Sequence, residues 1–287
     1  MRRLPPPELD PAEVYNACVA DVPGGQLAAT YAATAAAMVA SADQYRLQAA
    51  SGSLHTLPAS NWGHDDQVVI GALTKGDLTK LYESGMLKGP HGRTYYDQIL
   101  ASVPLGKCPY CRFGHAETLD HFLSKARYPS YSVLPSNLIP ACMRCNKGKG
   151  SGVLTSANEM SHPYFEMQQI EQDIWLLAEI TETNPVTAKY SVVIPNHWPA
   201  DLGRRVSNYF SEFDLAVRFA VEAASELVSM SSYLRDISSL NVRREHLQRV
   251  AQGESGISRN SWKTSLYVAL AASNWYSEVG YGLVGVP

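Results

Sequence analysis

The chain has 287 residues and a formal net charge of −3, which excludes a wholesale basic coat for nucleic acid and restricts any such site to a local patch. Hydrophobic residues make up 45% of the chain, enough to form a core. The start contains prolines and acids instead of an apolar run, and the longest uncharged stretch is rich in alanine, which gains little in lipid. We therefore expect a cytoplasmic protein with no membrane segment.

The first third of the chain is predicted to be helical. Alanine is the best helix former, and its abundance predicts helix over residues 8–52. Glycine, serine and proline in residues 53–72 predict a long connection. Two shorter helices are expected over residues 74–87 and 95–103, and the second leads directly to Cys108.

Four of the five cysteines form two CxxC pairs, Cys108 with Cys111 and Cys142 with Cys145. Zn²⁺ prefers four tetrahedral thiolate or imidazole ligands, and two such pairs supply four thiolates. The alternative, a redox dithiol, needs a thioredoxin-like βαβ context that is absent from this sequence. We expect a structural zinc site, closed to catalysis by its four sulfurs, and an inert Cys18 in the core.

Polar residues typical of a catalytic site lie between and just after the two cysteine pairs. Asp120 and His121 stand together in a short predicted strand, Asn137 precedes the second pair, and Asn146 follows it at once. Taken singly, these residues have ordinary interpretations as a surface pair, a turn and a helix cap. Their order around the zinc pairs favours a catalytic interpretation.

The segment from Cys108 to Gly150 resembles the HNH endonuclease superfamily and its ββα-metal fold. The resemblance rests on CxxC, then DH, then NL, then CxxCN followed by KGK. The surrounding sequence is similar to HNH nucleases of antiphage-defence operons, including those paired with an ATPase.

The resemblance implies a role for each matching residue. His121 would be the general base, Asp120 and Asn146 would ligate a catalytic Mg²⁺ or Mn²⁺, and Asn137 would brace the loop carrying the base. Asn146 stands where many members have histidine. The chemistry agrees with these roles, because neutral histidine can take a proton from water near pH 7 and hard oxygen ligands suit Mg²⁺ or Mn²⁺.

The charge of this segment favours contact with phosphate. Residues 107–150 contain seven cationic and two anionic side chains. We expect nucleic-acid contacts from Lys125, Arg144, Lys147 and Lys149, the alternative being a solvated cationic face. His162 is expected in a structural loop, with an accessory role in the site as the alternative.

The last part of the chain is predicted to contain a β-hairpin followed by helices. Apolar residues 175–180 and 189–194 flank a turn signal and predict the hairpin. One amphipathic helix is expected over residues 205–234 and a final helix over 260–279. The apolar face of the first helix is predicted to contain Val206, Phe210, Phe213, Val217, Ala220, Val221, Ala224 and Val228.

These patterns predict a mostly helical α+β protein, and the resemblance implies a zinc-stapled ββα nuclease core flanked by N- and C-terminal helices. The expected regions are residues 1–103, helical; 104–168, the nuclease module; and 169–287, the hairpin and helices.

The expected function is metal-dependent hydrolysis of DNA phosphodiester bonds, in antiphage defence. The alternative is a zinc-stabilised nucleic-acid-binding subunit without hydrolysis. RNA remains an alternative target, and an ATPase from the same operon or a second copy of the chain remains an alternative partner.

Overall fold

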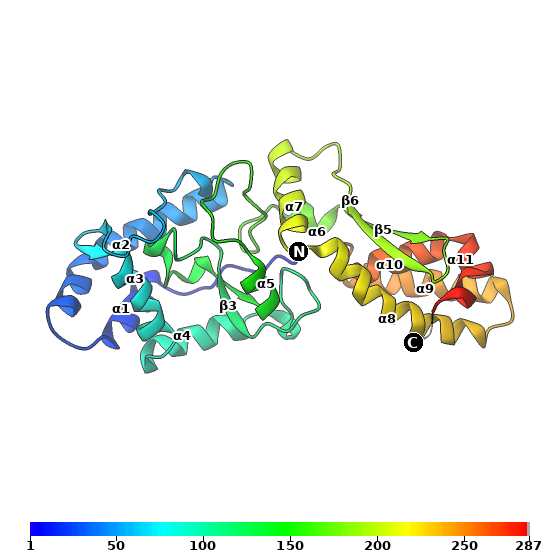
Figure 1. Cartoon of the computed structure of the whole chain (residues 1–287), viewed down its shortest axis with the longest axis horizontal. Helices are drawn as coiled ribbons and strands as arrows, with labels where there is room; N and C mark the ends of the chain where they lie inside the picture. Colours follow the sequence, from blue (N-terminus) through cyan, green and yellow to red (C-terminus); the bar gives the residue numbers. More distant parts are fainter. Residues whose placement is uncertain (286–287) are drawn as a thin grey trace. The chain divides into compact units, whose positions relative to one another are not determined.

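The computed structural model describes residues 1–285 and shows the expected class, a mostly helical α+β protein with two-stranded antiparallel sheets (Figure 1). The chain divides into two compact units. The first unit is Arg2–Glu166, and the second is Met1 with the residues from Met167 onward. The expected regions 1–103 and 104–168 therefore share one unit almost entirely. Among the described residues, no helix is both long and apolar enough to cross a membrane.

The first unit contains helices at its beginning and a ββα unit near its end. Its elements are α1 (Pro11–Ala20), α2 (Gln26–Ala50), β1 (Val68–Ile70), β2 (Leu73–Thr74), α3 (Lys75–Leu81), α4 (Pro90–Ala101), β3 (Thr118–His121), β4 (Leu138–Ala141) and α5 (Met143–Gly148). Asp10 begins α1 by accepting the N–H of Ala12. Thr74 begins α3 in a reciprocal capping box with Asp77.

The helices of the first unit pack around buried tyrosines. The Tyr15 hydroxyl of α1 donates to the Tyr31 carbonyl of α2, and the Tyr31 hydroxyl donates to the Asp77 carbonyl of α3. Gly85 lets this packing close up, since a Cβ there would lie 2.5 Å from the Cys18 carbonyl oxygen. Cys18 is fully buried in this core, as the sequence predicted.

Strands β3 and β4 are antiparallel, with Thr118 opposite Ala141 and His121 opposite Leu138. Helix α5 begins directly after β4, so the three elements form a ββα unit. The last residue pairs of the ladder bring the end of β3 beside the start of β4. Asp120 and His121 therefore lie at the end of a strand next to Asn137.

The second unit contains the predicted hairpin and a group of helices. Its elements are α6 (Gln169–Gln172), β5 (Leu176–Thr181), β6 (Thr187–Val192), α7 (Ala200–Glu212), α8 (Leu215–Arg235), α9 (Leu240–Ile257), α10 (Trp262–Ala272) and α11 (Asn274–Glu278). The pairing of β5 with β6 confirms the hairpin. Helix α10 packs against β5, and α8 packs against β6.

The single helix predicted over residues 205–234 is wrong. The backbone at Asp214 is left-handed, with φ of 49°, and separates α7 from α8. Because the break changes the phase of the helix, Val217 and Val221 are 57% and 64% exposed instead of lying on the buried face. Leu215 and Phe219 are buried in their place. The final predicted helix is likewise two helices, α10 and α11.

Candidate functional site

Four buried cysteines meet in one cluster of the first unit. The sulfurs of Cys108, Cys111, Cys142 and Cys145 all lie within 4.8 Å of one another. The sulfurs of Cys111 and Cys142 are 3.8 Å apart. Zn–S bonds of about 2.3 Å in a tetrahedron give sulfur separations of about 3.8 Å, so the four thiols could bind a structural zinc ion.

The turn after the first cysteine pair gives the cluster its shape. The backbone at Arg112 is left-handed, with φ of 69°, and brings the Gly114 N–H within 3.3 Å of the Cys111 sulfur. A Cβ on Gly114 would lie 2.9 Å from the Cys142 sulfur, so only glycine allows this close approach. Hydrogen bonds within the cluster lower the pKa of Cys111 and Cys142 and raise the pKa of Cys108 and Cys145.

The Asp120 carboxylate, on β3, belongs to a group of oxygen atoms that surround the Lys149 ammonium. The residue is buried, and its Oδ2 accepts the Tyr110 hydroxyl at 2.9 Å and the Lys149 ammonium at 2.5 Å. The ammonium also donates to the carbonyls of His121 and Phe122. These oxygens form a position that holds one positive charge, that of the Lys149 ammonium.

The His121 imidazole is oriented by a single backbone carbonyl. Its Nε2 lies 2.8 Å from the Ser132 carbonyl oxygen, which only accepts, so Nε2 carries the proton. Nδ1 keeps its lone pair and has no hydrogen-bond partner among the described residues. Burial lowers the pKa of His121 to about 3, so the ring is neutral at pH 7.

The Asn137 side chain closes the loop between β3 and β4. Its Nδ2 donates to the carbonyls of Leu123 at 3.1 Å and Tyr131 at 3.0 Å, and its Oδ1 accepts the Leu123 N–H at 2.7 Å. The Tyr45 hydroxyl also donates to Oδ1. Every hydrogen-bonding position of this buried amide is used, and the amide ties both ends of the loop together.

The Asn146 side chain, on α5, points its amide nitrogen back toward β3. Nδ2 donates to the Thr118 hydroxyl at 3.1 Å and to the Leu119 carbonyl at 3.4 Å. The amide orientation is thereby set, and Oδ1 remains as an atom that could ligate a cation.

The four basic residues expected to contact nucleic acid have different surroundings. Arg144 and Lys147 are exposed on α5. Lys125 pairs with Glu83 at 2.8 Å. Lys149 is buried against Asp120 instead of facing solvent, because the end of α5 directs its long side chain toward the carboxylate. Lys149 is therefore better placed to pair with Asp120 than to contact a phosphate.

His162 is buried beside the loop between β3 and β4, which the Asn137 side chain closes. Its Nδ1 accepts the Tyr164 N–H and its Nε2 contacts the Tyr45 hydroxyl, so neither nitrogen is directed at a ligand. Burial lowers the pKa of His162 well below its usual value.

Three residues near the site were not identified from the sequence, namely Tyr45, Tyr110 and Ser132. Tyr110 could have been considered because it stands inside the first CxxC pair. Tyr45 and Ser132 lie in stretches without any motif, and only the tertiary structure brings them to Asn137 and His121.

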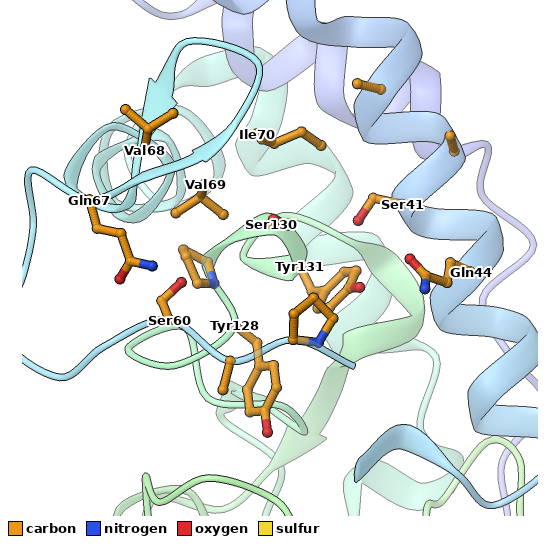
Figure 2. Close-up of a pocket in the computed structure, with 15 residues that line it drawn as sticks. Ser41, Gln44, Ser60, Gln67, Val68, Val69, Ile70, Tyr128, Ser130 and Tyr131 are labelled. Atoms are coloured by element: carbon orange, nitrogen blue, oxygen red, sulfur yellow. The ribbon is translucent and has the colours of Figure 1, made fainter. Parts of the chain in front are cut away.

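A cavity of about 400 Å³ lies between α2, β1 and the loop that joins β3 to β4 (Figure 2). Ser41 and Gln44 come from α2, Ile70 comes from β1, and Tyr128 and Tyr131 come from the loop. The lining that the structure describes contains no Asp, Glu, Lys, Arg or His side chain.

The sequence is similar to two known proteins. It is 30% identical to protein ea31 of Escherichia phage lambda over 231 residues, which cover 79% of this chain and 78% of ea31. It is 37% identical to Septu protein PtuB of Bacillus thuringiensis over 65 residues, which cover 21% of this chain and 25% of PtuB. No protein-family model matches the chain. No solved structure matches it either.

Proposed function

We propose that this chain, which belongs to the family of protein ea31 of Escherichia phage lambda, is a metal-dependent endonuclease that hydrolyses DNA phosphodiester bonds. The observation that carries the proposal is the pairing of two groups at the end of β3. Asp120 contributes to an oxygen-lined cation position, and the next residue, His121, presents a neutral imidazole with an unused Nδ1. A proton acceptor beside a cation position is what phosphodiester hydrolysis requires.

In the proposed reaction His121 is the general base. Its Nδ1 takes a proton from a water molecule, and the Ser132 carbonyl stabilises the resulting imidazolium through Nε2. Asn137 holds the loop that contains Ser132, so the ring stays oriented while the proton moves.

Asp120 and Asn146 are the residues that would hold Mg²⁺ or Mn²⁺. Asp120 supplies a carboxylate oriented by the Tyr110 hydroxyl, and Asn146 supplies its amide oxygen. A bound divalent ion would provide positive charge for the scissile phosphate and the leaving oxygen. Arg144 and Lys147, exposed on α5, would contact flanking phosphates.

We further propose a role in antiphage defence. The similarity to Septu protein PtuB, together with the four-cysteine cluster, is compatible with such a role. A cytoplasmic location, and a partner such as an ATPase or a second copy of this chain, belong to the same proposal. Light scattering of the protein alone and with the products of neighbouring genes tests the partner.

One observation favours the non-hydrolytic alternative, a zinc-stabilised nucleic-acid-binding subunit. The Lys149 ammonium already neutralises Asp120, and a module that only binds nucleic acid needs no metal ion there. The two functions differ in whether a divalent ion makes the protein cut.

Plasmid nicking by the full chain tests the proposal. We expect nicking with Mn²⁺ or Mg²⁺, none with EDTA, and a loss of about 10²–10⁴ in rate for His121→Ala, because the general base is removed. His64→Ala, which changes an exposed histidine of the same unit, should cut like the wild type. Wild-type cutting by His121→Ala would end the proposal, and metal-independent binding without cutting would favour the alternative.

A further inference from the structure

A chain of buried hydrogen bonds runs from His162 through Tyr45 to Asn137. His162 Nδ1 accepts the Tyr164 N–H at 3.1 Å, so Nε2 carries the proton and donates to the Tyr45 hydroxyl, also at 3.1 Å. The Tyr45 hydroxyl then donates to Asn137 Oδ1 at 3.0 Å. The direction of each bond is therefore determined.

The members of this chain are shielded from water. Tyr45 and Asn137 are 0% exposed and His162 is 5% exposed. A buried polar group that loses its partner cannot replace it with water, so the three side chains hold one another in a single arrangement. Their rings also pack on the loop after β3, Tyr45 against Tyr131 and His162 against Phe122.

This series of hydrogen bonds reaches the proposed base, His121, through Asn137. The Asn137 amide binds the backbone of Leu123 and the carbonyl of Tyr131. Leu123 lies two residues after His121, and Tyr131 directly precedes Ser132, whose carbonyl accepts from His121 Nε2. The amide thus fixes the backbone on both sides of the bond that orients the imidazole.

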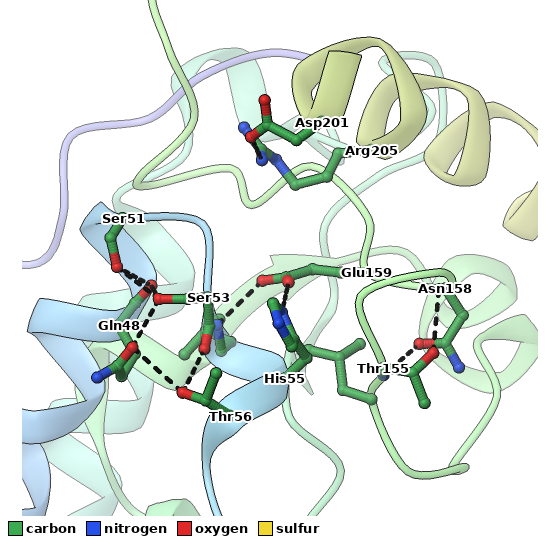
Figure 3. Close-up of polar contacts among 12 residues, drawn as sticks. Gln48, Ser51, Ser53, His55, Thr56, Thr155, Asn158, Glu159, Asp201 and Arg205 are labelled. Atoms are coloured by element: carbon green, nitrogen blue, oxygen red, sulfur yellow. Dashed lines mark hydrogen bonds and ion pairs between the residues drawn. The ribbon is translucent and has the colours of Figure 1, made fainter. Parts of the chain in front are cut away.

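The other end of this series of hydrogen bonds, at His162, is held near the end of α2. Glu159, three residues before His162, accepts the Leu54 N–H at 3.1 Å and lies 2.5 Å from His55 Nδ1 (Figure 3). These contacts tie the segment that carries His162 to the segment that follows Tyr45 and α2.

We propose that Tyr45 and His162 are positioning residues, which hold the Asn137 amide in one orientation and so keep the Ser132 carbonyl in place for His121. Neither side chain touches substrate. The inference rests on the proposed nuclease function for its kinetic consequence, but the orientation of His121 can be measured without cleavage.

Tyr45→Phe tests the inference because it removes only the hydroxyl. Tyr15→Phe is the matched control, since Tyr15 is also buried in the first unit and its hydroxyl donates to a carbonyl, that of Tyr31 at 2.9 Å. In steady-state cleavage of a DNA duplex with Mn²⁺, Tyr45→Phe should lower kcat about tenfold with KM unchanged, because the base is misplaced. Tyr15→Phe should stay within about twofold of the wild type.

The second measurement is ¹⁵N NMR of labelled histidine, in protein loaded with zinc and free of DNA. The wild type should show His121 protonated on Nε2, and Tyr45→Phe should show mixed tautomers or broadened signals for this ring, unlike Tyr15→Phe. A His121 signal and a kcat unchanged in Tyr45→Phe, or equal losses in both variants, would overturn the inference. If the wild type does not cleave, the proposed function fails and the NMR comparison alone decides.

A second pair of variants serves if Tyr45→Phe does not fold. Glutamine at position 162 can still donate to the Tyr45 hydroxyl, whereas leucine cannot. His162→Leu should lose the defined His121 tautomer and His162→Gln should restore part of it. Equal NMR signals and rates in these two variants would also overturn the inference.

Discussion

At the scale of single residues, Lys149 determines how the Asp120 site is charged. Its side chain is 8% exposed and that of Asp120 is 4% exposed, so the pair lies where charges are poorly screened. The ammonium and a divalent ion would need the same carboxylate. If the proposed metal ion binds there, lysine at this position would compete with it for Asp120, a role that the basic character of the segment did not reveal.

Lys149→Met should bind Mn²⁺ more tightly than the wild type. Methionine keeps much of the apolar stem and removes the competing charge, and we expect a Kd about tenfold lower, which corresponds to about 1.4 kcal/mol. Electron paramagnetic resonance of free Mn²⁺ during a titration measures this without cleavage. Lys147→Met, a change of the exposed neighbour, should leave the Kd unaltered. Weaker binding by Lys149→Met would show that the ammonium is not at the metal position.

At the scale of elements, the knuckle from Cys108 to Gly114 couples a turn to the four-cysteine cluster. The left-handed Arg112 and the N–H of Gly114 place the Cys111 sulfur opposite Cys142 at the start of α5. Because β4 leads straight into α5, a zinc ion at this point would tie the knuckle to both. The ββα unit is small and gains stability from such a tie.

Gly114→Ala should lower both zinc content and thermal stability. The added Cβ would lie 2.9 Å from the Cys142 sulfur and 3.3 Å from that of Cys111, so the cluster must distort. Gly152→Ala is the control, because nothing lies within 4 Å of a Cβ there. Zinc per chain by elemental analysis and the melting temperature are the measurements. A full zinc complement and a wild-type melting temperature in Gly114→Ala would contradict the assigned cluster geometry.

At the scale of the whole molecule, the partly buried His121 and the buried His162 should make stability depend on pH. Burial lowers the pKa of His121 to about 3 and lowers that of His162 well below its usual value. Below about pH 6.5, these histidines therefore bind protons in the unfolded chain and do not bind them in the folded chain. The free energy of unfolding is highest above this pH and should fall as the pH drops, by about 1.4 kcal/mol per pH unit for each histidine.

Urea unfolding at pH 7.0 and 5.0 measures this loss. His162→Gln should reduce the pH dependence by the contribution of one histidine, since the glutamine side chain does not titrate in this range. His64→Ala, at an exposed site, serves as the comparison and should leave the slope as it is in the wild type. The idea fails if His162→Gln shows the same slope between the two pH values.

The sequence by itself determined the features that depend on local geometry. A CxxC pair brings two sulfurs together within one turn, so the spacing of Cys108, Cys111, Cys142 and Cys145 predicted the cluster. The helical class and the hairpin of β5 and β6 likewise followed from residue patterns within short segments. The break at Asp214 escaped this approach, because the apolar period continues on both sides of one left-handed residue.

Only the tertiary structure decided which groups surround His121 and Asp120. Tyr45 is 92 residues from Asn137 and 117 from His162, and no sequence period relates positions so far apart. The partner of Lys149 was equally hidden, because a long flexible side chain can face solvent or turn inward, and the position of β3 beside α5 decides between them. Packing of distant segments, and not local propensity, set these contacts, since the buried polar groups had to find their partners within the folded chain.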